Sequence, residues 1–212
     1  YYMKFHYKAD YNNHLDKRGI PLLNYHGDIG LQYNPIAIAQ YGLGNYNLFL
    51  DTGDQSRLNK FILVSDWMVE NLETNKYGVP VWHHHFDFEY RELLKAPWYS
   101  GLAQGLGISV LARAYQETKN DKYLNTYKKS WESMSKQVGD GGVIYIDGEG
   151  NYWIEEYIVS PPTHILNGFI WALWGVYDSW KIMSNNNAKD LFEKCCFTIE
   201  NNLEKYDSGY WS

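Results

Sequence analysis

The sequence predicts an all-α protein, an incomplete (α/α) barrel or toroid made of about three helical hairpins with short β returns. A unit of about sixty residues recurs three times, and each copy opens on a proline ahead of an apolar helix, at Pro35, Pro97 and Pro162. In each copy a polar turn and a second, amphipathic helix follow, and the copy closes on a glycine before aromatic or β-branched residues. Such units cannot bury their apolar faces alone, so neighbouring hairpins pack side by side around an axis.

The first 30 residues precede the repeat and show no helical period. Residues 19–30 are rich in turn-forming residues, so we expect residues 1–30 to form an extended arm or a partial β segment. Residues 31–212 are expected to form the toroid, as a catalytic domain, and the end at Ser212 directly after the third return indicates truncation of the ring. Soluble proteins rarely leave a large apolar edge bare, so we expect a homodimer that covers it.

The first helix of each pair is expected in an inner ring, over residues 35–46, 97–117 and 162–183. Glycine and alanine in the second of these helices allow close helix approach, although each glycine costs about 1 kcal/mol against alanine. Tyr41, Trp171 and Trp174 follow the helical period and are expected to pack within the ring. The outer helices have apolar side chains at helical spacing: Leu58, Phe61, Ile62, Trp67 and Met68; Tyr123, Leu124, Tyr127, Trp131 and Met134; Leu191, Phe192, Cys195, Ile199 and Leu203.

The composition narrows the class of protein. A net charge of -6 with only 19 Lys and Arg argues against nucleic-acid binding, which requires a basic face. The apolar runs are far shorter than the roughly 20 residues of a membrane span, so we expect a soluble chain. The adjacent Cys195 and Cys196 are expected to be reduced thiols in the core, because neighbouring cysteines rarely bridge one another.

One segment carries the strongest functional signal. Glu155, Glu156 and Tyr157 place two carboxylates beside a phenol in a chain with 20 Tyr and 9 Trp. Aromatic rings cover the apolar faces of sugars, and carboxylates and phenols transfer protons, so the segment indicates a carbohydrate site. The alternative is that the two glutamates are solvated residues supporting the positive end of a following helix. Neighbours in an extended segment face opposite ways, so only one should reach a cleft.

Taken together, the ordered motifs resemble those of the D-glucuronyl C5-epimerase family, in its C-terminal helical domain. They extend from about Gln32 to Gly209 in the family's order. The matching segments are Tyr33-Asn34-Pro35-Ile36 and Ile38-Ala39-Gln40-Tyr41-Gly42-Leu43; Trp98-Tyr99-Ser100 and Ala103-Gln104-Gly105; Ile108-Ser109 and Arg113-Ala114-Tyr115; Glu155-Glu156-Tyr157 and Pro161-Pro162; Leu166-Asn167-Gly168-Phe169 and Tyr177-Asp178; and Tyr206-Asp207-Ser208-Gly209.

The resemblance implies an enzyme that inverts C5 of a hexuronic acid within a polysaccharide such as heparosan, without a cofactor or metal. Two proton carriers act on opposite faces of the ring, and the carboxylate must be neutralised while C5 is deprotonated. The resemblance implies Glu156 as one acid/base group, positioned with Tyr157. It implies that the second carrier follows the Tyr206 turn, beyond Ser212; within this chain, Tyr99, Tyr206 and Tyr210 are the candidates for that role. It implies a cleft lined by Tyr99, Gln104, Arg113, Glu155 and Asn167.

The chain departs from the family's pattern at Ser208, where the family has threonine, and it stops before the tyrosines and arginine that the family carries next. The resemblance therefore implies that this chain lacks part of its catalytic apparatus. It places the protein in the Golgi lumen or a cell-envelope pathway, or in the cytoplasm if the protein serves bacterial capsule synthesis.

Other readings stay open from the residues alone. A glycoside hydrolase or polysaccharide lyase would need a second carboxylate, for which Asp28, Asp87 and Asp147 are available, and a catalytically idle sugar-binding module is a third possibility. Arg113 either binds the uronate carboxylate or pairs with a buried acid, Asp178 or Glu156. His83 and His85 share one face of an extended segment, but no second ligand pair appears, so no metal is expected.

Overall fold

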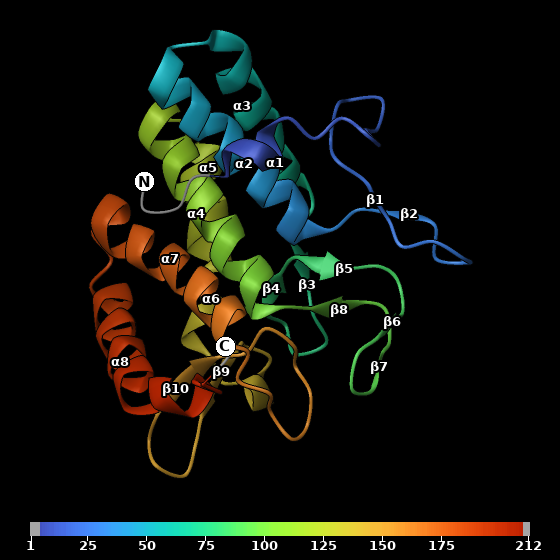
Figure 1. Ribbon diagram of the computed structural model, residues 1–212. Coiled ribbons are helices and arrows are strands. Elements are labelled where there is room, and N and C mark those ends of the chain that lie inside the picture. The colour runs from blue at the N-terminus through green and yellow to red at the C-terminus, as the bar shows by residue number, and fades with distance from the viewer. Residues whose placement is uncertain (1–4, 210–212) are drawn as a thin grey trace.

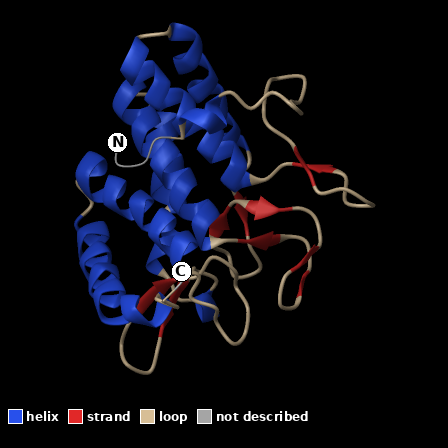
Figure 2. Ribbon diagram, viewed as in Figure 1, coloured by secondary structure: helices blue, strands red, loops and turns tan. Residues whose placement is uncertain are grey.

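The computed structural model describes residues 5–209, which form three consecutive helical hairpins with short strands gathered along one side (Figures 1 and 2). The predicted all-α class and the three hairpins are confirmed. Connections of two residues join the two long helices of each pair, so the partners run antiparallel. The pairs are α2 (Pro35–Thr52) with α3 (Gln55–Glu70), α4 (Gly101–Thr118) with α5 (Asp121–Ser130) and α6 (Glu132–Ser135), and α7 (Leu166–Met183) with α8 (Asn186–Asn202).

The helix α2 begins where the sequence predicts. Asn34 is extended, and its side-chain oxygen accepts hydrogen bonds from the backbone N–H groups of Ile36 and Ala37. Pro35 occupies the first helical position, where its missing N–H costs nothing. The helix continues beyond the expected Tyr46 to Thr52, where Gly53 ends it in the left-handed conformation.

The prolines ahead of α4 and α7 lie outside those helices, which corrects two predicted boundaries. Residues after Pro97 pair as β8 (Trp98–Tyr99) with β5 (His83–His84), so α4 starts only at Gly101, capped by Ser100. Residues 163–165 stay outside the helix, with His164 in the left-handed conformation, and α7 starts at Leu166 without a side-chain cap. In both places several non-helical residues separate the proline from the first turn of the helix.

The inner layer consists of α2, α4 and α7, with α4 between the other two, as Figure 1 shows. Glycine makes the α4–α7 contact possible, because a Cβ added at Gly175 would lie 1.9 Å from the backbone oxygen of Gly105. A Cβ at Gly105 would in turn lie 2.5 Å from the backbone of Ala172. The predicted close approach of inner helices is therefore confirmed.

The remaining elements are short. Two-stranded antiparallel pairs are β1 (Leu23–Asn24) with β2 (Leu31–Gln32), β3 (Glu73–Thr74) with β4 (Pro80–Val81), β5 with β8, β6 (Phe88–Glu89) with β7 (Leu93–Leu94), and β9 (Ile144–Ile146) with β10 (Tyr152–Ile154). Single turns form α1 (His6–Ala9), η1 (Val138–Asp140) and η2 (Leu203–Tyr206).

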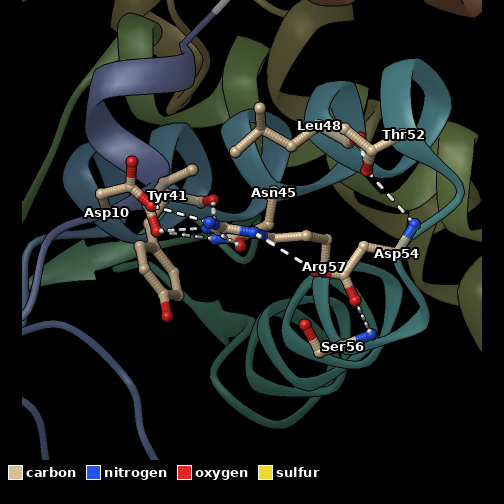
Figure 3. A network of polar contacts seen from close by, with 9 residues as sticks. Asp10, Tyr41, Asn45, Leu48, Thr52, Asp54, Ser56 and Arg57 are labelled. Carbon is tan, nitrogen blue, oxygen red and sulfur yellow. Dashed lines mark hydrogen bonds and ion pairs between the residues drawn. The ribbon is translucent and has the colours of Figure 1, made fainter.

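The segment before the repeat is partly helical, which the missing helical period did not reveal. The helix α1 docks on the first hairpin through Arg57 of α3, which donates to the carbonyl of Ala9 at 3.3 Å and to Asn45 of α2 at 3.2 Å. The same guanidinium forms an ion pair with Asp10 at 2.8 Å (Figure 3). The division of the chain at residue 30 remains a prediction.

Several other expectations concern the helix surfaces. Trp171 and Trp174 are half-buried and pack against the core, with ring centroids 6.1 Å apart, as expected. Cys195 is buried, but Cys196 is exposed, because the two neighbours face different sides of α8. Among residues 5–209, no helix has the length and hydropathy needed to cross a membrane. The homodimer remains a prediction.

Candidate functional site

The segment 155–165 joins β10 to α7 and forms the centre of the site. Glu155 is only 2% exposed, and its Oε2 accepts the backbone N–H groups of Thr163 and His164, both at 3.2 Å. Its other oxygen lies 2.5 Å from Nδ1 of His164. The backbone oxygen of Glu155 accepts the N–H of Gly101, at the start of α4. Glu155 thus joins the two ends of the segment 155–165 and ties this segment to the start of α4.

Glu156 faces a different direction from Glu155. Its carboxylate lies against Gly168, in the first turn of α7, where an added Cβ would be 2.0 Å from Oε2. Burial raises the pKa of this half-buried carboxyl, and a hydrogen bond with Tyr157 opposes the rise. The uncapped N-terminus of α7 favours a negative charge at this position. Glu156 is therefore a weakly hydrated carboxyl that holds its proton more tightly than a carboxyl in water does.

Tyr157 belongs to an aromatic wall formed by Phe86, Phe88, Tyr90, Trp98 and Tyr157. The Tyr157 ring stacks on Tyr90 with centroids 4.3 Å apart, and it lies 5.9 Å from Trp98. Burial and the neighbouring Glu156 raise the pKa of the phenol to about 12. Tyr157 therefore stays protonated near neutral pH and can hydrogen-bond the Glu156 carboxylate.

A cavity of about 470 Å³, the Tyr99 pocket, opens beside this wall and is within the usual size range of ligand sites. Burial raises the pKa of Tyr99 to about 12, with the nearby Tyr77 adding to the effect. Ile158 also lines the pocket, so the segment 155–165 reaches it although Glu156 itself does not. The lining residues with polar or aromatic groups are Thr74, Asn75, Lys76, Tyr77, His83, Trp98 and Tyr99.

Two residues expected to bind substrate are used inside the protein. Gln104 is fully buried and joins α4 to the backbone N–H and C=O of Trp82, at 2.9 and 3.1 Å. Arg113 pairs with Asp178 of α7 at 2.8 Å, which decides between the partners considered from sequence. Neither side chain faces the Tyr99 pocket. Substrate contact at these two positions, and at Asn167 in the exposed first turn of α7, remains a prediction.

The candidate tyrosines near the end of the chain divide into two cases. Tyr206 donates its hydroxyl hydrogen to the backbone oxygen of His164, and burial followed by the charge of Glu155 raises its pKa. Tyr206 thus lies within the site and supports the loop. Tyr210 lies outside the described residues, so its role stays a prediction.

Sequence reasoning did not identify His164 or Lys76. His164 is nine residues from Glu155 across a turn with a left-handed φ of 47° at the histidine, so spacing does not reveal their contact. Its place between Pro162 and Leu166, inside a motif already singled out, was the available signal. Lys76 lies in the turn between β3 and β4, and only the fold brings it to the Tyr99 pocket.

Residues considered for other chemistries have structural partners. His83 and His85 do share a face, and both contact Oε2 of Glu73, at 2.9 and 3.1 Å. Asp87 pairs with Lys95 at 2.6 Å, and Asp147 organises the β9–β10 turn by accepting the side-chain N–H of Trp153 at 3.0 Å. Asp87 and Asp147 are thus occupied in forming loops.

Solved structures share the fold. A family 76 α-mannanase of Bacteroides thetaiotaomicron is similar with a TM-score of 0.58 and 19% identity, over 86% of this chain and 45% of that one. A protein of Listeria innocua is similar with a TM-score of 0.56 and 16% identity, over 84% and 48% of the two chains. At such identities the likeness concerns the arrangement of helices alone.

Sequence comparison identifies the family. A D-glucuronyl C5-epimerase of Caenorhabditis elegans is 34% identical over 165 residues, which are 70% of this chain and 26% of the relative. An uncharacterized protein of Methanocaldococcus jannaschii is 30% identical over 155 residues, 71% of this chain and 50% of the relative. The family model described as the D-glucuronyl C5-epimerase C-terminus matches residues 75–212. This chain therefore belongs to the D-glucuronyl C5-epimerase family.

Proposed function

We propose that this chain forms the helical catalytic part of a hexuronate C5-epimerase that acts on a uronate-containing polysaccharide of the heparosan type. The main support is the position of Glu156. Its carboxyl is desolvated against Gly168 and next to a protonated phenol, in the motif that the chain shares with its family. A carboxyl with a raised pKa is suited to accept a proton from carbon and to return it.

The reaction requires charge stabilisation as well as a base. The C5 hydrogen is adjacent to a carboxylate, and its removal gives a dianionic, enolate-like species. Lys76, exposed in the Tyr99 pocket, supplies a positive charge that would pair with the carboxylate of a uronate bound in that pocket. Arg113, the candidate from the sequence, pairs with Asp178 at 2.8 Å. In the proposed arrangement the aromatic side chains Trp98, Tyr99 and Tyr77 contact the faces of neighbouring sugars.

The decisive experiment follows exchange of the C5 hydrogen with deuterated water, observed by NMR on heparosan-type polymers. The protein is expressed from its complete reading frame. Glu156→Gln keeps the shape of the side chain but removes the proton acceptor, so we expect exchange to fall by roughly 10²- to 10⁴-fold. Affinity for the polymer should change little.

The matched control is Glu89→Gln, which removes an exposed carboxylate of β6 on the same side of the molecule. It should exchange at the wild-type rate. Glu155→Gln is unsuitable as a neutral control, because Glu155 binds His164. Normal exchange in Glu156→Gln would refute the assignment. Shortened polymer chains would instead indicate a hydrolase or lyase, and binding without exchange would indicate a sugar-binding module.

A further inference from the structure

We propose that a second cavity of this protein binds a further stretch of the acidic polymer, next to the Tyr99 pocket. This cavity, the Lys194 pocket, lies between the second and third helical hairpins. The inference rests on the proposed function for the class of ligand, a uronate-containing polysaccharide. None of the residues that line the Lys194 pocket belongs to the motifs that resemble those of the family.

The Lys194 pocket is built from three parts of the fold. Its volume is about 390 Å³, within the usual range of ligand sites. Trp131 lines it from the end of α5, Ile146 and Tyr152 from β9 and β10, and Lys194 from α8. The backbone N–H of Tyr152 donates to Oγ1 of Thr198 in α8 at 2.8 Å. The strands and the helix that form the pocket are therefore joined directly.

Lys194 supplies a positive charge that is open to a ligand. Its Nζ lies 4.5 Å from the centre of the Tyr152 ring and 3.5 Å from the Tyr152 hydroxyl oxygen, which belong to a neutral side chain. Among residues 5–209, Lys194 forms no ion pair with a carboxylate. Lys136 also lines the pocket, but it pairs with Glu132 at 2.7 Å. An anionic group in this pocket would therefore interact mainly with Lys194.

The other lining residues suit a sugar acid better than a simple anion. Trp131 and Tyr152 provide aromatic surface, which packs against the apolar faces of sugar rings. Gln137, Asn187 and Asp190 provide amide and carboxylate groups that can form hydrogen bonds with sugar hydroxyls. The negative charge of Asp190 disfavours a densely charged ligand. The lining therefore fits sugars that carry single carboxylates, as a uronate-containing polymer does.

The two pockets meet along the segment 136–139. Lys136 and Gln137 line the Lys194 pocket, and the next residues, Val138 and Gly139 of η1, line the Tyr99 pocket. Cα atoms of consecutive residues are about 3.8 Å apart, so one backbone segment separates the two cavities here. A polymer that leaves the Tyr99 pocket over η1 therefore reaches the Lys194 pocket, whereas a single sugar occupies only one of them.

One polymer chain in both pockets should bind more tightly than separate sugars. Once the first pocket is filled, the second contact is intramolecular and forms at a high effective concentration. Affinity should therefore rise when an oligosaccharide is long enough to cross the segment 136–139, and the rise should depend on Lys194.

The test uses calorimetric titration of the protein, expressed from its complete reading frame, with a trisaccharide and a dodecasaccharide of the heparosan type. Lys194→Met keeps most of the length of the side chain but removes its charge. We expect the affinity for the dodecasaccharide to fall by about tenfold, as loss of one hydrogen bond to a charged group does, and the affinity for the trisaccharide to stay the same.

The matched control is Lys189→Met. Lys189 also lies in α8, but it pairs with Glu193 at 3.6 Å and does not line the pocket. This variant should bind both oligosaccharides as the wild type does. Lys194→Glu reverses the charge at the same exposed position and should lower the affinity for the dodecasaccharide further.

Wild-type affinity of Lys194→Met for the dodecasaccharide would overturn the inference and leave the proposed function intact. Equal losses for both oligosaccharides would overturn it too, because Lys194 would then act in the first pocket. An equal loss with a neutral polymer of the same length would exclude a carboxylate as the partner of Lys194. Length-dependent binding that requires Lys194, in a protein without C5 exchange, would support the Lys194 pocket and refute the proposed function.

Discussion

The carboxylate of Glu156 occupies the space where residue 168 would carry a side chain. A Cβ built on Gly168 would lie 2.0 Å from Oε2, 2.7 Å from Cδ and 2.9 Å from Cβ of Glu156. Gly168 is inside a regular helix, so its backbone does not require glycine. Glycine at position 168 therefore leaves room for the Glu156 carboxylate, and the helix backbone itself would accept another residue.

Gly168→Ala should therefore separate activity from stability. Alanine gains up to about 1 kcal/mol of helix propensity, while the whole Glu156 side chain, from Cβ outward, must move. We expect an unchanged or higher melting temperature and a fall in C5 exchange of about 10²-fold, the cost of a displacement of about 1 Å. Circular dichroism and the deuterium exchange assay measure the two effects, and full activity in the variant would contradict the position assigned to Glu156.

The raised pKa of Glu156 predicts a pH-dependent effect on stability. The folded protein binds this proton more tightly than the unfolded chain, so at neutral pH the desolvated carboxylate lowers the free energy of unfolding. The cost disappears below the unfolded pKa of about 4.3. Glu156→Gln should melt at a higher temperature than wild type at pH 7, and the two should converge towards pH 4. Calorimetry that shows the variant less stable at pH 7 would be inconsistent with desolvation.

The buried ion pair between α4 and α7 predicts a large effect on folding. The side chains of Arg113 and Asp178 are 12% and 3% exposed, and Ser109 donates to the same carboxylate. Arg113→Ala leaves a buried charge and should cost about 3–5 kcal/mol in urea denaturation, whereas Arg113→Met with Asp178→Leu should recover much of this loss.

The control is Arg18→Ala, which breaks an exposed pair with Glu70, 48% and 50% exposed, and should cost at most about 1 kcal/mol. If Arg113→Ala and Arg18→Ala lowered the free energy of unfolding by similar amounts, burial of the ion pair would not determine its contribution to stability.

The Lys76 side chain predicts how the Tyr99 pocket selects its ligand. Hydrogen bonds to charged groups contribute about 1.5–3 kcal/mol, so Lys76→Met should weaken binding of a uronate oligosaccharide by about tenfold or more. Binding of a neutral oligosaccharide should be unaffected. Lys119→Met, at the exposed end of α4, is the matched control in calorimetric titrations. Equal affinities of both variants for the uronate ligand would exclude Lys76 as its partner.

Much of the helical framework follows from local chemistry that the sequence displays. Asn34 and Pro35 form a cap and a first turn that depend only on neighbouring residues, and the glycines of α4 predict a close helix contact. The helices α4 and α7 start later than Pro97 and Pro162 predict. Strand pairing holds Trp98 and Tyr99 extended, and the contacts of Glu155 with the next loop hold Thr163 and His164 outside the helix.

The site is harder to predict for a related physical reason. The motif identifies Glu156 and Tyr157, but the partner of each buried polar group is decided by tertiary packing. Glu155 meets His164 only because the loop reverses, and Arg113 meets Asp178 across two helices 65 residues apart in sequence. The spacing of these residues along the sequence does not predict either contact.

The glycine contact between the inner helices has a further consequence. A Cβ added at Gly175 would lie 1.9 Å from the oxygen of Gly105, so Gly175→Ala should cost about 1–3 kcal/mol in urea denaturation, whereas Gly148→Ala, with open space around it, should change stability by at most about 0.5 kcal/mol. A similar small effect at Gly175 would show that the helices can separate.

Gly101 joins the start of α4 to the Glu155 backbone, and Gly168 supports Glu156 at the start of α7. The positions of Glu155 and Glu156 relative to the two inner helices are therefore set at glycines, where no second side chain acts as an adjustable spacer. The outer helices α3, α5 and α8 do not enter these contacts. Substitutions on the exposed faces of α3 and α5 can therefore change the surface without touching these contacts, whereas α8 reaches the same segment through Thr198, which accepts the backbone N–H of Tyr152 in β10 at 2.8 Å.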